Sequence, residues 1–200
     1  MSDPAELDYV FGYASLVALS EPGALPGRLR GYRRYWGVAM DNWEATNDRK
    51  HFLDPRTGER LRIRVAYLNL REDAGSAVNG LALPVDADRL AALDEREVNY
   101  ERVDLTGAFE PACGVAEDPA LPLPRARVFT YVGTAAARER CRRGLAEGDC
   151  FVSRDYVADV RSAFAALGED ALVELDRTTD SLPFPERDLQ VVPPHDLLPL

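Results

Sequence analysis

The stretch VFGYASL, residues 10–16, reads as the end of a buried strand followed by a turn. Residues 9–11 are aromatic or β-branched, which favours a short strand, and Gly12 is a typical residue at which to end one. Ala14 and Ser15 are small where a buried strand would carry Val, Ile or Leu. Such a stretch fits either an ordinary turn or a backbone kept open for a ligand.

Further strand patterns follow along the chain. Residues 29–40, LRGYRRYWGVAM, are rich in aromatic side chains, and residues 126–133, ARVFTYVG, in aromatic and β-branched ones. Residues 61–70, LRIRVAYLNL, begin with strict alternation between apolar residues and arginine, which predicts one buried and one exposed face. Residues 81–85, LALPV, follow a loop that contains glycine. We therefore expect these last two segments to pair as a hairpin.

Three helices are interspersed with these strands. Residues 86–100 begin with an Asp cap, residues 153–168 begin with Ser153 or Asp155 and end at Gly168, and the Ala-rich residues 134–148 are expected on the surface. Strands and helices in this irregular order predict an α+β fold with a mixed sheet rather than a regular βαβ winding. The polar stretch at residues 41–60 is expected to be an excursion from the sheet.

Length and composition predict one soluble domain. The 200 residues are 46% hydrophobic and 29% charged, and they can bury a core without metals or disulfides. We expect a single domain over residues 1–200, with a Pro-rich C-terminal tail at residues 186–200.

Residues 1–9 lack the features of a leader peptide, and no stretch is apolar enough to span a membrane. A cytoplasmic location is therefore the expectation, with reduced thiols at all three cysteines (Cys113, Cys141 and Cys150) and no metal site.

The net charge of −10 argues against nucleic acids and anionic membranes as partners, because both would be repelled. One basic run, formed by Arg28, Arg30, Arg33 and Arg34, departs from this acidic balance. Apolar and aromatic residues alternate with these arginines, so the run is interpreted as the solvated face of a strand. No oligomeric state is predicted.

Glu97 is the strongest catalytic candidate. In an ideal helix with Leu90 at zero, Leu93 points near ~300° and Glu97 near ~340°, so the carboxylate lies within the apolar arc. Burial of a carboxylate raises its pKa towards the range that suits a general base. The alternative is that Glu97 reaches solvent or pairs with Arg96 or Arg102. Asp86, Asp94 and Glu95 are weaker candidates, because charged residues on a helix usually face water.

Two other side chains, Ser15 and Tyr131, are candidate site residues. Ser15 lacks the G-x-S-x-G context of a nucleophile, and the chain has only His51 and His195 to serve as its base. Tyr131 fits a core aromatic residue as well as a ligand contact.

Three stretches, VFGYASL (10–16), LDEREVNY (93–100) and VFTYVG (128–133), together resemble the gamma-glutamylcyclotransferase-like family and occur in its order. That family typically has a Y-G-S loop after its first strand, then L-D-x-x-E with the catalytic glutamate, then a strand with an inward tyrosine. Ala14 stands where the family usually has glycine, and Val98 and Asn99 follow Glu97 where a glycine is common. If the first of these positions needs a positive φ, Ala14 would be strained.

The resemblance implies both a fold and a chemistry. The fold is a mixed sheet curled towards a small barrel with flanking helices. By the resemblance Glu97 is the general acid and base, and the substrate-binding residues are Val10, Phe11, Gly12, Tyr13, Ala14, Ser15, Leu16 and Tyr131. The reaction cyclises a small gamma-glutamyl compound, as in glutathione metabolism, to 5-oxoproline and releases an amine or amino acid. The α-amine of the substrate is the nucleophile, so no cofactor is needed.

Two alternatives to this cyclotransferase remain. The same fold could carry a non-catalytic binding or regulatory protein, which is favoured if Ala14 closes the loop. A carboxylate-dependent hydrolase that acts on another amide or on a sugar is the other alternative.

Overall fold

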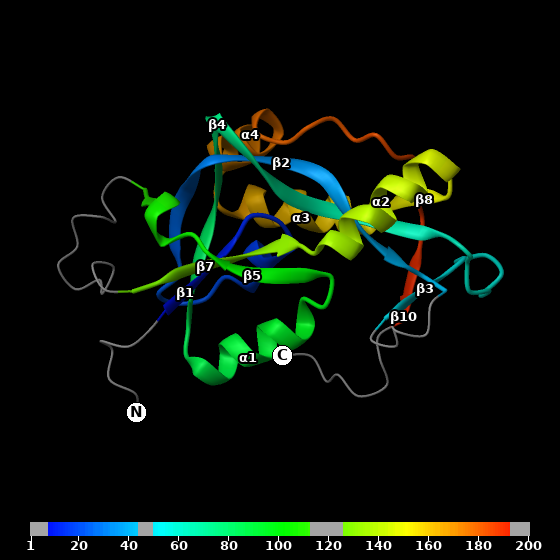
Figure 1. The fold of residues 1–200 in the computed structure, drawn as a ribbon, viewed down its shortest axis with the longest axis horizontal. Coiled ribbons are helices and arrows are strands. Elements are labelled where there is room, and N and C mark those ends of the chain that lie inside the picture. Colours follow the sequence, from blue (N-terminus) through cyan, green and yellow to red (C-terminus); the bar gives the residue numbers. More distant parts are fainter. Residues whose placement is uncertain (1–7, 44–49, 113–125, 193–200) are drawn as a thin grey trace.

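The computed structural model describes residues 8–43, 50–112 and 126–192. In Figure 1 a strongly curled sheet forms the centre, and helices lie around it. The main strands are β1 (Asp8–Gly12), β2 (Leu25–Asp41), β4 (Arg64–Val85), β5 (Tyr100–Asp104), β6 (Phe109–Pro111), β7 (Val128–Gly133), β8 (Cys150–Ser153) and β9 (Glu186–Arg187). The helices of the described ranges are α1 (Ala87–Arg96), α2 (Ala135–Glu147), α3 (Arg154–Ala166) and α4 (Glu169–Arg177), with short 3₁₀ turns η2 (Ser15–Leu19) and η4 (Thr106–Ala108).

The sheet mixes parallel and antiparallel pairs. Its order is β5-β7-β1-β4-β2-β6, and β8 joins through β4 and carries β9. β1 runs parallel to β7 but antiparallel to β4. A separate pair joins β3 (His51–Leu53) to β10 (Gln190–Val192). The predicted α+β fold with a curled mixed sheet is confirmed. Residues 186–192 of the predicted tail contain β9 and β10, whereas 193–200 lie outside the described residues.

The predicted hairpin is wrong, because residues 64–85 form one continuous strand. β4 pairs with β2 on both sides of a bend, from Asp41 opposite Arg64 to Leu25 opposite Ala82. The polar residues expected in a loop lie where the two strands bend together. There the register shifts between Arg30 and Tyr32, and Gly31 takes a φ of +79°. A β-bulge bends a strand without ending it, so a polar stretch with glycine did not mark a turn.

The predicted alternation of buried and exposed residues also fails in the first half of β4. Residues 64–70 are all buried, because helices and strands cover both faces there. Arg64, predicted on the solvent face, is 9% exposed and donates to Glu147 and Asp149 at 2.6 and 2.7 Å. Ion pairing therefore replaces hydration at this position.

The predicted helices form with local shifts. Asp86 caps α1 by accepting a hydrogen bond from the Arg89 N–H at 2.9 Å. α1 ends at Arg96, four residues before the predicted end, and β5 begins at Tyr100. α2 lies on the surface between a Thr134 cap and Gly148 at φ +74°. α4 was not predicted, although Leu172 and Leu175 have helical spacing.

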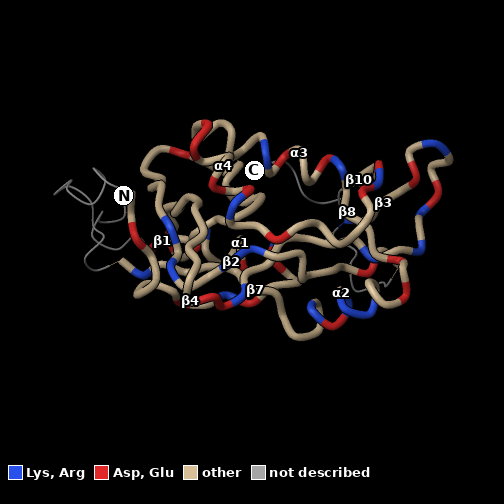
Figure 2. The backbone as a smooth tube through the Cα atoms, turned by 90° about the horizontal axis from the view of Figure 1, so that it is seen from above, with Lys and Arg blue, Asp and Glu red and all other residues tan. Residues whose placement is uncertain are grey.

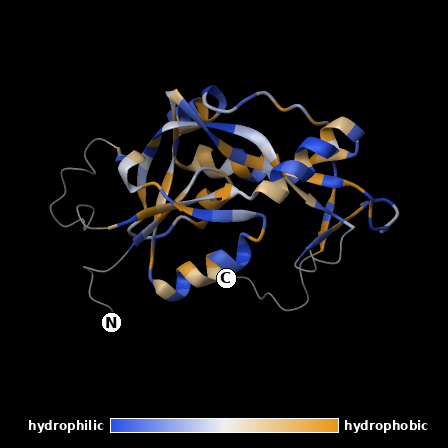
Figure 3. Cartoon of the chain, in the orientation of Figure 1, coloured by the Kyte–Doolittle hydropathy of each residue, from blue (hydrophilic) through white to orange (hydrophobic). Residues whose placement is uncertain are grey.

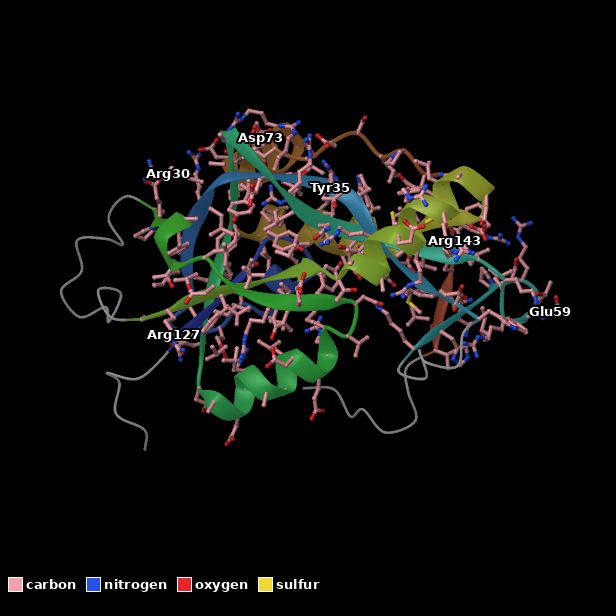
Figure 4. All side chains as sticks on the ribbon, viewed as in Figure 1. Arg30, Tyr35, Glu59, Asp73, Arg127 and Arg143 are labelled. Atoms are coloured by element: carbon pink, nitrogen blue, oxygen red, sulfur yellow. The ribbon has the colours of Figure 1, made fainter. Side chains whose placement is uncertain are left out.

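The basic run is not a solvated face throughout. Arg28 and Arg30 are exposed, but Arg34 is fully buried. In Figure 4, Arg30 projects near the bend of β2 and β4, where Asp73 also lies, whereas Arg143 projects from α2 and Glu59 lies at the opposite end. The reason for the failure is the strong curl of β2, which turns Arg34 towards the interior between β4 and α4.

The core lies inside the curl of the sheet. Figure 3 shows hydrophobic residues concentrated on the central strands and hydrophilic residues on the exposed parts of α1 and α2. Acidic and basic residues are interspersed along the chain in Figure 2.

Within the described residues, every helix is too short or too polar to span a bilayer. Those residues also contain no group of three or more His, Cys, Asp or Glu side chains that could hold a metal ion.

Candidate active site

The stretch at residues 10–16 leaves β1 at Gly12 and enters η2 at Ser15. A Cβ on Gly12 would lie 2.8 Å from the Leu16 Cβ, so the tight turn itself excludes a larger residue. Ala14 has φ −144° and ψ −125°. No non-glycine residue in the described ranges has a positive φ, so Ala14 avoids the left-handed conformation that would strain it.

Tyr13 is held at both ends. Its hydroxyl donates to the Tyr131 carbonyl at 2.8 Å, and its own carbonyl accepts from the Arg34 Nε at 2.7 Å. The two partners come from β7 and β2, on different sides of the turn. The turn is therefore fixed between two strands rather than free at its tip.

Glu97 directly follows the last residue of α1. Its backbone has φ −89° and ψ 44°, and its N–H donates to the Leu93 carbonyl at 2.9 Å. The side chain is 15% exposed, and its Oε1 lies 3.5 Å from the Arg96 Nε. The inward direction inferred from the helical projection therefore holds, although the residue itself lies beyond the helix.

The pKa of Glu97 is raised above its ordinary value of 4.5, and burial is the largest cause. The positive charges of Arg96 and Lys50 oppose the shift. An isolated buried carboxylate favours its neutral form, while nearby cations favour the ionised form. Glu97 is thus balanced between the two forms more closely than a surface carboxylate would be.

Five tyrosines lie within the electrostatic field of the Glu97 carboxylate. Burial raises the pKa of each phenol, and the negative charge of Glu97 raises it further. They come from the turn, β4, β5, β7 and α3: Tyr13, Tyr67, Tyr100, Tyr131 and Tyr156. At neutral pH all five phenols are therefore neutral, so they offer hydroxyl groups and ring faces without adding charge.

The backbone of Leu68 anchors part of this tyrosine cluster. Its carbonyl accepts from the Tyr100 hydroxyl at 2.9 Å, and its N–H donates to the Tyr156 hydroxyl at 3.4 Å. The Tyr67 and Tyr156 rings pack edge to face with centroids 5.0 Å apart. These contacts fix the walls around Glu97 on the rigid centre of the sheet.

Lys50 brings a second cation to the cluster. Its Nζ lies 4.7 Å from the centroid of the Tyr67 ring and 5.9 Å from that of Phe52. Burial lowers the pKa of this ammonium, Glu97 raises it, and Arg96 lowers it. Lys50 is exposed as a residue, and its ammonium lies over aromatic rings and within the field of Glu97.

The structure brings several of the predicted site residues together. Glu97, Tyr13 and Tyr131 share one electrostatic environment. The Tyr131 hydroxyl donates to the Asp94 Oδ1 at 2.8 Å, so this group is already engaged. Ser15 is partly buried beside the turn, and the remaining predicted residues of the turn are buried in the core: Val10, Phe11, Gly12, Ala14 and Leu16.

Sequence reasoning missed Lys50, Tyr67, Tyr100 and Tyr156 as neighbours of Glu97. Lys50 belongs to a polar stretch whose position in space no periodicity reveals. The tyrosines looked like ordinary core residues, and only the curl of the sheet brings β4, β5 and α3 to the same place.

Two cavities lie to one side of this cluster. One of about 290 Å³ is lined in part by Trp36, Leu68, Val160 and Asp180, and one of about 510 Å³ by Arg33, Tyr35, Trp36 and Asp180 among others. Glu97 lines neither cavity. The candidate site is therefore the cluster around Glu97 rather than either cavity.

Comparison with solved structures identifies the fold. A structure described as gamma-glutamyl cyclotransferase matches 88% of this chain and 90% of its own length, with 13% identity and a TM-score of 0.50. YkqA from Bacillus subtilis matches 90% of this chain and 56% of its own length, with 14% identity and a TM-score of 0.51. No family model and no curated protein matches the sequence.

These similarities define the class of protein as a curled α+β half-barrel with flanking helices. The chain has the gamma-glutamylcyclotransferase-like fold, as the three sequence stretches predicted. At 13–14% identity the comparison concerns the fold, and the activity must be argued from the side chains.

Proposed function

We propose that this protein is a gamma-glutamylcyclotransferase that converts a small gamma-glutamyl amide or peptide into 5-oxoproline and a free amine or amino acid. The observation that carries the proposal is the placement of Glu97, a buried carboxylate with a raised pKa, in the same tyrosine cluster as Tyr13 of the 10–16 turn. Its resemblance to the L-D-x-x-E glutamate of the family supports the same role.

Glu97 supplies the proton transfers that cyclisation needs. It accepts a proton from the substrate α-ammonium, and the neutral amine then attacks the side-chain carbonyl carbon. As the ring C–N bond forms, protonated Glu97 gives this proton to the departing nitrogen, and the old C–N bond breaks. Glu97, ionised again, takes the second proton from the attacking nitrogen and passes it to the released amine, so no net proton is consumed. A carboxyl group with a raised pKa suits this alternation between base and acid.

The 10–16 turn supplies hydrogen-bond donors. Ala14, Ser15 and Leu16 precede or begin η2, so their N–H groups come before its first internal bond, which runs from the Val17 N–H to the Ala14 carbonyl at 3.1 Å. Such groups are suited to hold the substrate carboxylate or the carbonyl oxyanion. Binding also holds the substrate in the folded conformer that its own amine needs for attack.

The neutral tyrosines and the Lys50 ammonium complete the proposed pocket. The neutral phenols do not repel the substrate carboxylate, and Lys50 attracts it. The chain thus supplies every group for the reaction from its own residues, and the partner implied is a small molecule.

The test is incubation of the purified protein with glutathione and with a panel of gamma-glutamyl amino acids and amines, followed by quantification of 5-oxoproline. Formation of 5-oxoproline from at least one substrate is the expected result. Free glutamate in place of 5-oxoproline would indicate a hydrolase. Absence of turnover with measurable binding of the same compounds would favour a non-catalytic binding protein and overturn the proposal.

A further inference from the structure

Arg34 is the largest fully buried side chain in the described residues. It lies in the middle of β2 and packs its guanidinium 5.0 Å from the centroid of the Phe164 ring on α3. A buried arginine is rare unless it is paired, because burial removes the hydration of its charge. The hydrogen-bond partners of the guanidinium therefore indicate its role.

The guanidinium hydrogen-bonds to neutral oxygens on three separate segments. Its Nε donates to the Tyr13 carbonyl at 2.7 Å, and one terminal nitrogen donates to the Thr178 Oγ1 at 2.6 Å. The other terminal nitrogen donates to the Asn79 Oδ1 at 3.0 Å and to the Asn79 carbonyl. Arg34 thus ties the 10–16 turn to β4 and to the end of α4.

The bond to Tyr13 fixes a peptide plane. The carbonyl of Tyr13 and the N–H of Ala14 belong to one trans peptide, so they point in opposite directions. When the carbonyl points to Arg34, the Ala14 N–H points away from Arg34. The Tyr13 hydroxyl, bound to the Tyr131 carbonyl, prevents the residue from turning as a unit.

We infer that Arg34 is a positioning residue: it orients the peptide between Tyr13 and Ala14 so that the Ala14 N–H serves the oxyanion of the cyclisation. The inference rests on the proposed function. It explains why an arginine lies in the core opposite a turn, since a planar guanidinium holds three acceptors in fixed directions, which a lysine ammonium on its flexible stem would not. Arg34 acts through the peptide and does not itself contact the substrate.

The experiment compares three single variants with wild type. Arg34→Lys keeps the positive charge but loses the planar guanidinium with its several N–H donors. Thr178→Val removes one hydrogen-bond acceptor of the guanidinium, at a distance from the turn. Val152→Ala is the matched control, because this fully buried residue belongs to a cluster with Ala39 and Cys150 that contains none of the residues bound by Arg34. For each protein we would measure thermal stability, kcat, KM and the amide ¹⁵N chemical shift of Ala14.

The expected result is a fall in kcat of about 10²-fold for Arg34→Lys with little change in KM, because a misaligned oxyanion donor weakens the transition state. Thr178→Val should lower kcat by about two- to tenfold, in line with one hydrogen bond. The Ala14 amide signal should shift in both variants. Val152→Ala should lose stability while keeping its kcat and its Ala14 signal.

Two results would overturn the inference: an Ala14 signal that stays in place in Arg34→Lys, or a kcat loss equal to that of Val152→Ala at equal stability. If Arg34→Lys does not fold, Thr178→Val carries the same comparison. If wild type turns over no gamma-glutamyl substrate, the proposed function fails and the oxyanion role fails with it. The Ala14 signal then still decides separately whether Arg34 orients the peptide.

Discussion

Arg34 and Glu97 both act electrostatically on Tyr13, but their surroundings differ. Arg34 donates to Tyr13, Thr178 and Asn79, and all these contacts are hydrogen bonds to neutral oxygens. Glu97 has an ion-pair contact with Arg96 at 3.5 Å, within a cluster of neutral phenols. Burial lowers the pKa of Arg34 to about 9 and raises that of Glu97.

The difference separates a structural ion from a reactive one. Arg34 has its donors committed to the fold, so its charge holds segments together. The Glu97 side chain has an ion-pair contact with its neighbour Arg96, and burial shifts its pKa towards the neutral form. Burial destabilises the charged form of both side chains. At Glu97 this raises the pKa of the carboxyl group, which suits it to proton transfer.

Glu97→Gln should have the largest effect on activity. Gln has nearly the same shape but exchanges no proton, so cyclisation should fall by about 10²- to 10⁴-fold. The raised pKa of Glu97 means that wild type loses stability as pH rises through that pKa, and Gln lacks this loss. The variant should therefore be at least as stable as wild type at neutral pH. Assays of 5-oxoproline and thermal unfolding check both points, and retained turnover would remove Glu97 from the mechanism.

Arg34→Met should lower kcat at least as much as Arg34→Lys, because it also removes the bond to the Tyr13 carbonyl, and unlike Glu97→Gln it should lose stability as well. The change leaves the acceptors on Tyr13, Thr178 and Asn79 buried without their donor, at a cost of about 3 kcal/mol in the free energy of unfolding. Urea denaturation would measure it. A variant as stable as wild type would show that the desolvation cost of the Arg34 guanidinium equals the stabilisation from its hydrogen bonds.

Tyr131→Phe should have a moderate effect on stability. It removes the hydrogen bond to Asp94, which keeps its ion pair with Arg102 at 2.9 Å, so the loss should be about 1 kcal/mol. The backbone carbonyl that holds Tyr13 remains. KM should change little. A rise in KM of about tenfold, worth about 1.4 kcal/mol of binding, would place this hydroxyl on the substrate instead.

Lys50→Met should have the smallest effect and should appear mainly in the pH profile. The Lys50 charge lowers the pKa of Glu97, so its removal should raise that pKa and move the acid limb of kcat/KM to higher pH. On that limb, activity should fall by about two- to fivefold, the size expected of a partly solvated charge pair. Lys50→Arg, which keeps the charge, should leave the limb in place; a shift in both variants would contradict this explanation.

The sequence was a good guide to local structure and to Glu97 but a poor guide to long-range curvature. The Asp86 cap, α3 and the inward glutamate follow from short-range patterns. The bend of β4 does not, because a polar stretch with glycine fits a bulge as well as a turn. Arg34 looked solvated for the same reason. Its acceptors are 21, 45 and 144 residues away along the chain, beyond the range of any periodicity.

The continuity of β4 has a consequence for how the chain can be altered. This strand carries Tyr67, which lies in the electrostatic field of Glu97, and, after the bend, Asn79, which accepts a hydrogen bond from Arg34. Insertion of a single residue between positions 68 and 79 would turn the side chains of one half of β4 to the opposite face of the sheet relative to the other half. This change is avoided only if the bulge accommodates the extra residue. Within residues 68–79, natural or engineered changes in length at the bend opposite Gly31 should therefore leave both ion sites intact.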